Sequence, residues 1–528
     1  MTDQAAIVDF LAQPATHGGH RVSRIDTHGA FLFMAGKRAY KLKRSVRFAY
    51  MDYSSLEKRR LACEAEVRLN RRTAPGLYRG TEAIRLLRDG SLRLGGPQGR
   101  VVDWVVVMRR FEESALLSRV AARGGLDAGI MRTLAEAIWR FHDRAEIRKR
   151  DGGIKAHRAV AATILAEIDR HAAVFDEKRR TQLRRRTEAL LELGADALER
   201  RRAAGRVRHG HGDLHLRNIC LLDGVPTLFD CLEFDPELAI EDVLYDVAYL
   251  LMDLDRLNLR PLANLVLNRY LELGGDYDGL GLMPLFLSQR AAIRAHVLAS
   301  TADVAEEAAR QKQLRREAGE YLDLALAYAK PAAPRFIAIG GLSGTGKSSV
   351  ARLLAPKLAP APGAVVLRSD VLRKQLAGVG ETERLPASAY TATTAQQVYG
   401  ELLRRAALVA KAGHSVIVDA TFTDPVQRRA VEKAAPRGVP FTGLWLAAAR
   451  RVLLDRVVAR RGDASDADRD TVAAQAQLKL GDIAWHKVPA GGTLTQNVRA
   501  ALARLRDAKP AAATGRRAKP RGRTPDGA

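Results

Sequence analysis

His211-Gly-Asp-Leu-His-Leu-Arg-Asn218 is the stretch that decides the fold of the first part of this 528-residue chain. It places an aspartate five residues before an asparagine, ahead of the strand-like residues 219–222. In phosphoryl transfer, an aspartate in such a loop accepts the proton of a hydroxyl group, and the asparagine ligates a metal ion on the phosphates. A further carboxylate must hold that metal ion, and Asp230 follows the next strand-like stretch, residues 225–229. The pattern therefore indicates a site for nucleotide chemistry.

A later segment, Tyr245-Asp-Val-Ala248, completes a family resemblance. With it, the chain from about residue 20 to 300 resembles the aminoglycoside phosphotransferase and choline kinase-like branch of the protein-kinase fold. The resemblance implies that Asp213 is the catalytic base. It also implies that Asn218 and Asp230 are metal ligands.

Other polar residues near this loop have supporting or alternative roles. The resemblance implies that His211 organises the loop backbone and that Asp246 braces the loop. His215 is more typical of a hydrogen-bonding loop residue than of a catalyst. Asp235 stays an alternative to Asp230 as the metal ligand.

A lysine on a strand of the small lobe should reach the nucleotide phosphates and be oriented by a helix carboxylate. An Ala-x-Lys pattern ends at Lys41, and Lys43 competes with it from the same strand face. We choose Glu64 as the partner, with Glu66 nearly as good, because helical periodicity alone does not decide between them. The glycine-rich loop of protein kinases is poorly represented, since Gly29 is the only glycine between the start of the first strand and the next turn.

The apolar patterns predict a small mixed lobe over residues 20–110 and a mostly helical lobe over residues 112–330. The elements expected in the small lobe are a hairpin of residues 30–34 and 39–43 turned at 35–38, a helix opened by the capping-box pattern of residues 54–57 and ending near Asn70, and a buried strand over residues 101–108.

A second phosphate-binding motif, Gly341-Leu-Ser-Gly-Thr-Gly-Lys-Ser348, follows the apolar residues 336–339 and opens a helical stretch. Strand, glycine loop and helix form the context in which this Walker A pattern binds a nucleotide. Backbone amides wrap the phosphates, Lys347 contacts the β- and γ-phosphates, and Ser348 ligates magnesium. The residues predicted to bind the nucleotide here are Gly341, Ser343, Gly344, Thr345, Gly346, Lys347, Ser348 and Ser349.

Residues at the ends of later strands predict the acceptor side of this second site. Asp370 is placed to act as a base towards an acceptor hydroxyl, and Arg373 follows it on the same helix. Asp419 ends another strand and suits the magnesium-water shell. A mobile lid should bring guanidinium groups to the transferring phosphoryl group, with Arg460 as its catalytic member. The candidate lid arginines are Arg456, Arg460 and Arg461.

Residues 335–507 resemble the small P-loop kinases, a group that includes gluconate kinase, the zeta-toxin type and the kinase half of phage polynucleotide kinase. Ser369-Asp-x-x-Arg373 is the specific part of the match. The resemblance implies that Asp370 is a general acid or base and that Arg373 contacts the acceptor or its phosphate. Strand-like segments alternate with helical ones here, which predicts a parallel sheet covered by helices on both faces. The segments are residues 336–339, 364–367, 415–418 and 441–446.

The amino-acid composition limits which binding partners and which cellular location we expect. The net charge of +26 is spread along the chain, so we expect a diffuse solvated excess more than a polyanion-binding surface. Nucleic acid is the less favoured partner, because aromatic residues make up only 5% of the chain. Three cysteines without metal-ligand spacing, and no apolar run of membrane-spanning length, predict a cytoplasmic protein that does not bind membranes.

The patterns together predict two α/β domains and a tail. The whole chain resembles bacterial bifunctional aminoglycoside phosphotransferase/ATP-binding proteins, in which the second half is an AAA-family P-loop domain. The predicted divisions are a protein-kinase-like bilobal domain over residues 1–330 (small lobe about 1–110, helical lobe about 111–330), a P-loop kinase domain with a parallel sheet over 331–507, and a disordered basic tail over 508–528.

The expected function is transfer of the γ-phosphate of ATP, with Mg2+, to hydroxyl groups of small molecules at two nucleotide sites. In the alternative, the P-loop half is a polynucleotide 5′-hydroxyl kinase or a regulatory ATPase, with only one half catalytically active. The sequence does not indicate an oligomeric state. Because the chain is basic and its helical lobe has no dense acidic run, we expect the first acceptor to be uncharged or anionic rather than a polycation.

Overall fold

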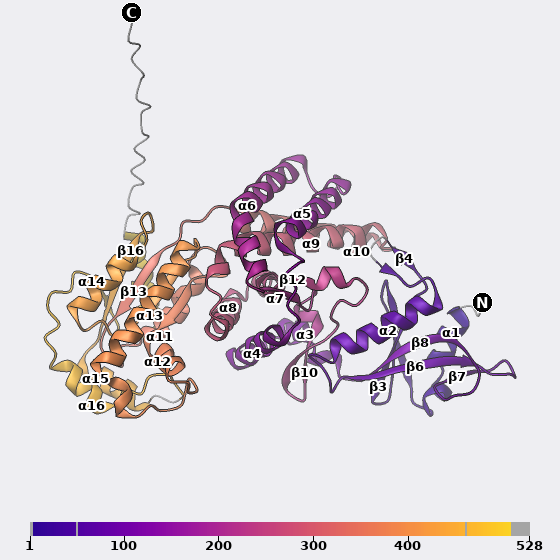
Figure 1. Cartoon of the computed structure of the whole chain (residues 1–528), viewed down its shortest axis with the longest axis horizontal. Coiled ribbons are helices and arrows are strands. Elements are labelled where there is room, and N and C mark those ends of the chain that lie inside the picture. The colour runs from indigo at the N-terminus through magenta and orange to yellow at the C-terminus, as the bar shows by residue number, and fades with distance from the viewer. Residues whose placement is uncertain (1–3, 49–50, 460–461, 508–528) are drawn as a thin grey trace, which may run out of the picture. The chain divides into compact units, whose positions relative to one another are not determined.

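The computed structural model describes residues 4–48, 51–459 and 462–507 (Figure 1). The chain divides into two compact units, the first made of Met1–Pro331 with Pro360–Gly363, and the second of Ala332–Ala359 with Ala364–Ala528. The predicted fold class, a bilobal kinase-like domain followed by a parallel-sheet P-loop domain, is confirmed. The basic tail predicted over residues 508–528 lies outside the described residues.

The small lobe of the first unit is a six-stranded sheet in the order β1-β2-β3-β8-β6-β7. The predicted hairpin is confirmed, because β2 and β3 pair antiparallel around a turn at Gly36 and Lys37. The predicted helix is also confirmed, although its N-cap is Ser55, whose hydroxyl accepts the backbone N–H of Lys58 at 3.2 Å. The elements are α1 (Gln4–Ala12), β1 (Val22–Asp26), β2 (Ala30–Ala35), β3 (Arg38–Lys43), β4 (Arg47–Phe48), β5 (Met51–Asp52), α2 (Leu56–Asn70), β6 (Tyr78–Leu86), β7 (Leu92–Leu94) and β8 (Arg100–Arg109).

Two apolar clusters hold this sheet. On one face, Cys63 and Val67 of α2 pack against Val106 and Met108 of β8, and Figure 1 shows α2 running beside β8. The other face carries α1, whose Leu11 packs into a cluster with Phe33, Leu42 and Val105. Burial of α2 against the central strand fixes which side of that helix faces β3, and this positions the nucleotide-binding carboxylate described below.

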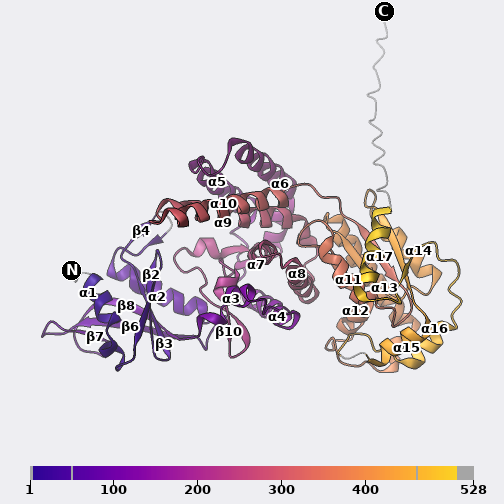
Figure 2. The ribbon, with the colours of Figure 1, turned by 180° about the vertical axis from the view of Figure 1, so that it is seen from behind.

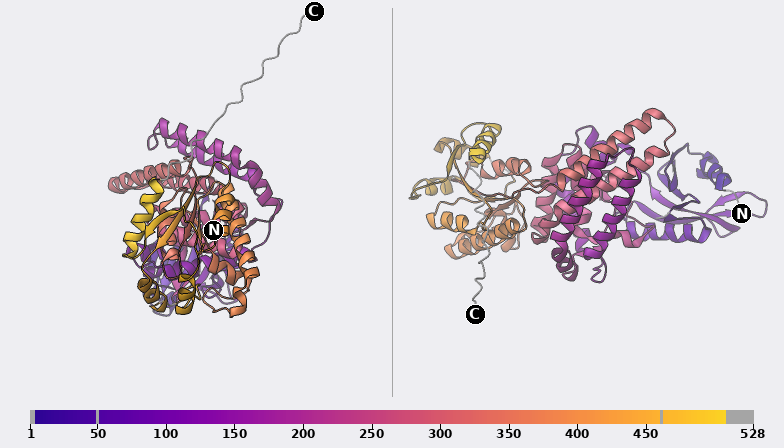
Figure 3. Two further views of the ribbon diagram at one scale, coloured as in Figure 1. Left: turned by 90° about the vertical axis from the view of Figure 1, so that its left-hand side faces the viewer. Right: turned by 90° about the horizontal axis from the view of Figure 1, so that it is seen from above.

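The large lobe is a set of helices that contact one another side by side, seen from above in the right-hand view of Figure 3, where they run from purple to rose. Two short antiparallel pairs, β9 with β12 and β10 with β11, lie in this lobe, and the motif of residues 211–218 connects β9 to β10. The elements are α3 (Leu117–Ala122), α4 (Ala128–Arg144), α5 (Gly153–Arg170), α6 (Glu177–Ala203), β9 (Val207–His209), β10 (Ile219–Leu222), β11 (Val225–Leu228), β12 (Ile240–Asp242), α7 (Val243–Arg256), α8 (Arg260–Gly274), α9 (Met283–Asp303) and α10 (Ala308–Tyr328).

The second unit, whose helices α11 to α17 are labelled in Figure 2, is built on a five-stranded, fully parallel sheet in the order β14-β15-β13-β16-β17. Four of its strands are those predicted, and β17 is an additional edge strand. Val350 of α11 and Val498 of α17 pack together with Ile337 and Ile417 of the sheet. The elements are β13 (Phe336–Gly340), α11 (Lys347–Leu354), β14 (Val365–Arg368), α12 (Ser369–Leu376), α13 (Ala392–Lys411), β15 (Val416–Asp419), α14 (Pro425–Ala434), β16 (Phe441–Ala447), α15 (Arg450–Ala459), α16 (Arg469–Ala476), β17 (His486–Pro489) and α17 (Leu494–Asp507).

All three cysteines of the chain, Cys63, Cys220 and Cys231, lie in the first unit as buried free thiols. Burial raises the pKa of Cys63 and of Cys220 to about 12. In the described part of the chain, no helix is long and apolar enough to cross a membrane.

Candidate active sites

The loop between β9 and β10 brings the predicted base and one predicted metal ligand together. The side-chain amide of Asn218 donates to the Oδ2 atom of Asp213 at 2.8 Å and to its backbone oxygen at 3.0 Å. The Nε2 atom of His215 lies 3.3 Å from the same carboxylate oxygen. His215 also accepts the backbone N–H of Arg217 through Nδ1, at 3.3 Å, which is the loop-bonding role expected of it.

Asp246, a buried residue of α7, fixes this loop by hydrogen bonding. The Oδ2 atom of Asp246 accepts the backbone N–H of His211 at 2.6 Å and lies 3.1 Å from Nε2 of His142. His211 in turn donates through Nε2 to the backbone oxygen of Phe229 at 3.0 Å, which ties the loop to the end of β11. Asp246 therefore braces the loop, as the resemblance implied.

The charge at Asp213 is stabilised by its surroundings. Burial by itself would raise the pKa of this carboxyl, but His215, His211 and Arg294 outweigh burial and lower the pKa below its usual value. A carboxylate that stays ionised can accept a proton from a hydroxyl group during the reaction. Asp213 is thus in the protonation state that a general base needs.

Asp230 follows β11 with a backbone conformation that non-glycine residues rarely adopt. Its φ is 62°, in the left-handed region, and strain of this kind is concentrated at functional sites. Its backbone N–H donates to the hydroxyl of Tyr78 at 3.3 Å, and its Oδ1 atom accepts from Nζ of Lys41 at 2.7 Å. The alternative ligand, Asp235, instead caps a short helical turn by accepting the backbone N–H of Glu237 at 3.0 Å.

The lysine of β3 is paired with Glu66 rather than with Glu64, which corrects the first choice of partner. Nζ of Lys41 donates to Oε1 of Glu66 at 2.9 Å, and the Glu66 side chain is fully buried. Glu64 lies on the outer side of α2 and pairs with Arg60 at 2.7 Å. Glu66 occurs in the buried stripe with Cys63 and its neighbours, so the apolar periodicity of α2 carried a signal that favoured it.

Sequence reasoning missed how Lys43 and Glu233 extend this ion pair. Lys43, which is 1% exposed, donates through Nζ to the second oxygen of Glu66 and to Oε1 of Glu233. The hydroxyl of Tyr53 donates to the same Glu233 oxygen at 2.8 Å. Burial would lower the pKa of Lys43, but Glu233 and Glu66 outweigh it and raise the pKa above its usual value. Both lysines are therefore cations held on one buried carboxylate.

Replacing Glu66 by glutamine should destabilise the first unit by about 3–5 kcal/mol, because it leaves the buried Lys43 charge without half of its compensation. We also expect weaker ATP binding at this site, since Lys41 loses the group that orients it. Glu64→Gln is the matched control on the same helix, and should cost about 0.3–0.5 kcal/mol, the value of a helix surface pair. Denaturant unfolding and ATP titration of both variants measure these effects; equal losses would contradict the assignment of Glu66.

The glycine loop of the second unit is shaped by backbone contacts that leave no room for side chains. Gly341 has a φ of 142° and Gly344 a φ of 85°. A Cβ atom on Gly344 would lie 2.5 Å from the backbone oxygen of Leu453, and one on Gly341 2.6 Å from that of Leu446. The two glycines therefore allow the loop to pass close to β16 and α15.

A Gly344→Ala substitution should abolish nucleotide binding at this loop or unfold the second unit, since the added methyl group meets fixed backbone. Gly400→Ala is the control, because a Cβ there meets nothing within 4 Å and lies on α13. We expect that control to be neutral or slightly stabilising, by up to about 1 kcal/mol. Calorimetric titration with a nucleotide and thermal melting compare the two variants, and unimpaired binding by Gly344→Ala would show that the loop is wider than described.

The predicted nucleotide residues of this loop are brought together. Ser348 donates through Oγ to Oδ2 of Asp419 at 2.6 Å, and Lys347 donates to the backbone oxygen of Leu342 at 3.1 Å. The Thr345 hydroxyl closes the loop by donating to the same oxygen at 2.7 Å. The residues of the motif that line the adjoining cavity are Ser343, Gly344, Gly346, Lys347, Ser348 and Ser349.

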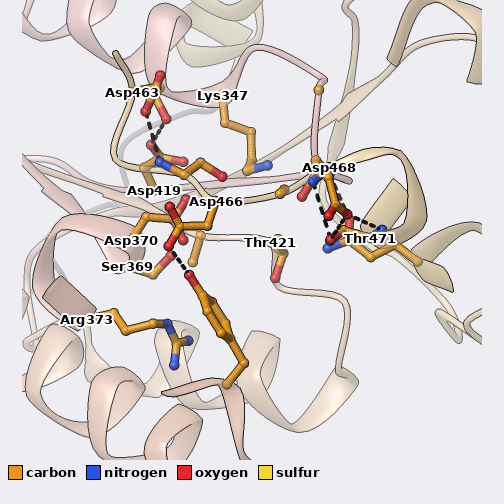
Figure 4. A pocket seen from close by; sticks show the side chains of 18 of the residues that line it. Lys347, Ser369, Asp370, Arg373, Asp419, Thr421, Asp463, Asp466, Asp468 and Thr471 are labelled. Atoms are coloured by element: carbon orange, nitrogen blue, oxygen red, sulfur yellow. Dashed lines mark hydrogen bonds between the residues drawn. The ribbon is translucent and has the colours of Figure 1, made fainter. Parts of the chain in front are cut away.

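This cavity has a volume of about 880 Å3 and also contains the predicted acceptor side. In the view of Figure 4, Asp370 and Asp419 lie between Lys347 and Arg373. Burial, and next the nearby charge of Asp419, raise the pKa of Asp370 above its usual value. A raised pKa makes this carboxylate a stronger base towards a hydroxyl group than an exposed aspartate would be.

Two arginines belong to α12 and its N-cap: Arg368, the N-cap residue, approaches these carboxylates, and Arg373 lies in the last turn of the helix. Arg368 pairs with Asp463 at 2.6 Å, and its Nε atom lies 3.6 Å from the carboxylate of Asp419. Arg373 donates to the backbone oxygen of Ala389 at 3.0 Å and lies over the ring of Tyr390, 4.8 Å from its centre. Arg368 was not among the predicted site residues, although it directly precedes the Ser-Asp-x-x-Arg segment.

The predicted lid is described only in part. Arg456 lines the cavity, and its guanidinium is held there by donating to the backbone oxygen of Ala490 at 2.8 Å and to that of Thr345 at 3.4 Å. Arg460 and Arg461 lie outside the described residues. After them, Asp466 ties the segment to the unit by accepting from Lys374 at 3.0 Å and from the hydroxyl of Tyr390 at 2.6 Å. Figure 4 shows Asp463, Asp466 and Asp468 around the cavity.

The donor sets suit magnesium held jointly with phosphates. Among the residues that the structure describes, no group of three or more His, Cys, Asp or Glu side chains is arranged to hold a metal ion alone. Magnesium in nucleotide sites is held by one or two protein oxygens plus phosphate oxygens and water. Ser348 with Asp419, and Asn218 with Asp230, each offer that number of oxygen donors at the mouth of a phosphate-binding element.

Comparison with known proteins identifies both units. A family model described as "Phosphotransferase enzyme family" matches residues 53–282, and one described as "AAA domain" matches residues 336–479. Uncharacterized proteins from Mycobacterium tuberculosis and Mycobacterium bovis are 33% identical to this chain over 496 residues, which cover 90% of this chain and 93% of each relative. The chain belongs to the same family as these mycobacterial proteins. Both family resemblances noted in the sequence are thereby confirmed, and the chain is an enzyme of the kinase class.

Solved structures match each unit separately. A gluconokinase from Sinorhizobium meliloti is 24% identical and covers 33% of this chain and 94% of its own, with a TM-score of 0.25. The amicoumacin kinase hAmiN is 14% identical and covers 61% of this chain and 93% of its own, with a TM-score of 0.38. A choline/ethanolamine kinase family protein from Mesorhizobium loti is 13% identical and covers 62% and 99%, with a TM-score of 0.33.

Proposed function

We propose that this phosphotransferase has two ATP sites, each of which transfers the γ-phosphate to a hydroxyl group of a small molecule. This is supported most directly by the presence, in each unit, of a lysine suited to bind phosphates and a carboxylate suited to act as a base. In the first unit these are Lys41 with Glu66, and Asp213. In the second unit they are the glycine loop with Lys347, and Asp370.

In the first unit, each residue of the site has a separate role in binding or catalysis. Lys41, oriented by Glu66, binds the α- and β-phosphates, and Asn218 and Asp230 hold the metal ion. A Mg2+ ion held by these two residues would supply positive charge that neutralises the phosphates during transfer. Asp213 accepts the proton of the acceptor hydroxyl. The hydrogen bond that Asn218 donates to Oδ2 of Asp213 holds this carboxylate oxygen beside the proposed metal ligand Asn218. The braced loop pre-organises both groups before the acceptor binds.

In the second unit, Lys347 and the loop amides bind the β- and γ-phosphates, and Ser348 with Asp419 holds the metal ion. Asp370 accepts the proton of the second acceptor, and Arg373 binds the acceptor or the phosphoryl group. Arg460 stays a prediction for the lid.

A transfer assay with γ-labelled ATP over a metabolite extract tests this proposal. The wild-type chain should label acceptors of two kinds, because the two sites have different linings. Hydrolysis of ATP without transfer to any hydroxyl compound would contradict the proposal. Labelling of only one kind of acceptor would restrict it to one unit.

A further inference from the structure

A second cavity, also of about 880 Å3, lies in the helical lobe of the first unit beside the catalytic loop. It is next to Asp213, because His215 lines the cavity and its Nε2 atom is 3.3 Å from that carboxylate. Five arginines and four carboxylates contribute to its wall. They are Arg119, Arg217, Arg256, Arg294 and Arg316, with Glu113, Asp253, Glu317 and Glu320.

Two of these carboxylates are neutralised by arginines of the same wall. Glu113 pairs with Arg119. Glu320 pairs with Arg256 and also lies 3.3 Å from Arg316. The charges of these two carboxylates are therefore compensated within the wall by three of its arginines.

A third wall carboxylate, Asp253, is hydrogen-bonded to the backbone of the catalytic loop. Oδ2 of Asp253 accepts the backbone N–H of Leu216 at 3.0 Å, which fixes the turn between Asp213 and Asn218. The remaining carboxylate, Glu317, lies on α10 and accepts from the side chain of Gln313 at 2.8 Å.

Two wall arginines are linked to the catalytic loop: the charge of Arg294 acts on Asp213, and Arg217 belongs to the loop itself, four residues after Asp213. Over residues 4–48, 51–459 and 462–507, neither makes an ion pair with a carboxylate within 4.0 Å. Arg294 projects from α9 between aromatic side chains, with its guanidinium 5.8 Å from the ring centre of Tyr321. Its charge is among those that stabilise ionised Asp213. Arg217 is exposed and immediately precedes Asn218 in the loop.

We propose that the acceptor of the first site carries an acidic group, a phosphate ester or a carboxylate, in addition to the hydroxyl that is phosphorylated. This inference rests on the proposed function and names the class of its first acceptor. The planar guanidinium of Arg294 binds the acidic group through paired hydrogen bonds, and Arg217 adds positive charge at the loop. A cationic acceptor would instead bring its charge against both arginines, which selects against it.

The group transfer then balances without any further reactant. The acceptor hydroxyl oxygen forms a bond to the γ-phosphorus of ATP as the bond from that phosphorus to ADP breaks. The hydroxyl proton passes to Asp213. The acidic group on Arg294 takes no part in bond making, so Arg294 acts in binding and orientation of the acceptor.

The first experiment uses the full chain with Lys347→Ala, which removes phosphate binding at the other nucleotide site. A metabolite extract is separated by ion exchange into anionic, neutral and cationic fractions, and each is incubated with γ-labelled ATP. We expect labelled product from the anionic fraction. Labelling confined to the neutral or cationic fraction would overturn this inference and leave the proposed function standing. No labelling from any fraction, by a chain that also fails to turn over ATP, would overturn both.

The second experiment compares Arg294→Gln with Arg294→Lys on the anionic acceptor found in the first. Arg294→Gln should raise KM for the acceptor by about 10- to 100-fold, the loss of a charge-assisted hydrogen bond, with KM for ATP unchanged. Arg294→Lys should recover part of this loss, because it restores the charge without the paired geometry. Phosphate-bearing and carboxylate-bearing acceptors, compared in the same assay, show which acidic group the site prefers.

The control is Arg184→Gln, which removes one positive charge from α6 where Arg184 pairs with Asp169. It should leave KM for the acceptor unchanged, so a general charge effect is separated from a local one. A loss in kcat for Arg294→Gln that is the same for every acceptor, without a change in acceptor KM, would overturn the inference. That result would assign Arg294 to the transferring phosphoryl group.

Discussion

Asp213→Asn in a chain that also carries Lys347→Ala should lower kcat for phosphoryl transfer by about 10²–10⁴-fold, the usual contribution of a general base. Asparagine has nearly the same shape and still accepts a hydrogen bond from Asn218 at the position where the carboxylate accepts one at 2.8 Å. It cannot take up the hydroxyl proton. We therefore expect the melting temperature and KM for ATP to change little while turnover disappears.

Steady-state kinetics on the labelled acceptor measure this effect, and Asp235→Asn provides the matched control. Asp235 caps a short helical turn, and asparagine is an equally good capping residue, so transfer should be retained. Full activity of the Asp213 variant would contradict its role as the base. Loss of activity in the Asp235 variant alone would move the metal site from Asp230 to Asp235.

Lys347→Ala should lower transfer at the second site by about 10²–10³-fold or more, since one preorganised cation at the transferring phosphates is removed. The first site should keep its activity, because its phosphate lysine, Lys41, belongs to a separate unit and a different fold. Lys357→Ala, which changes an exposed lysine of the same unit, is the control. The measurement is label transfer to the two kinds of acceptor, in parallel.

The two single variants together decide how many working sites the chain has. Two active sites predict that Asp213→Asn and Lys347→Ala each abolish transfer to one kind of acceptor and spare the other. If either change alone removed all ATP turnover, the chain would have a single working site, and the other nucleotide site would serve regulation or binding.

Local patterns were enough to predict most of the framework. A periodicity or an apolar run specifies the hairpin of β2 and β3 and the helix α2. The same is true of four strands of the parallel sheet, β13, β14, β15 and β16. The edge strand β17 has no such pattern in the sequence, because only one of its residues, Val488, is buried. A short polar edge strand has no pattern of its own and forms only because β16 offers it a partner.

The parts of the site that escaped prediction depend on contacts between distant segments. Glu233 reaches Lys43 across 190 residues of sequence, and no local periodicity reports such a contact. The choice between Glu64 and Glu66 depended on which face of α2 packs against β8; the apolar spacing of Cys63 and Val67 indicates that face, but the contact with β8 decides it. The capture of Arg456 by backbone oxygens was likewise invisible in a basic sequence where most arginines are solvated.

The location of the cysteines gives this chain a built-in reporter. All of its thiols lie in the first unit. A thiol-reactive dye added to the unmodified protein therefore reports transient opening of that unit and does not label the second. Because the thiols are buried, we expect their labelling to proceed through transiently opened molecules. A nucleotide that binds and stabilises the first unit should therefore slow the labelling, and this comparison needs no mutation, truncation or assayable substrate.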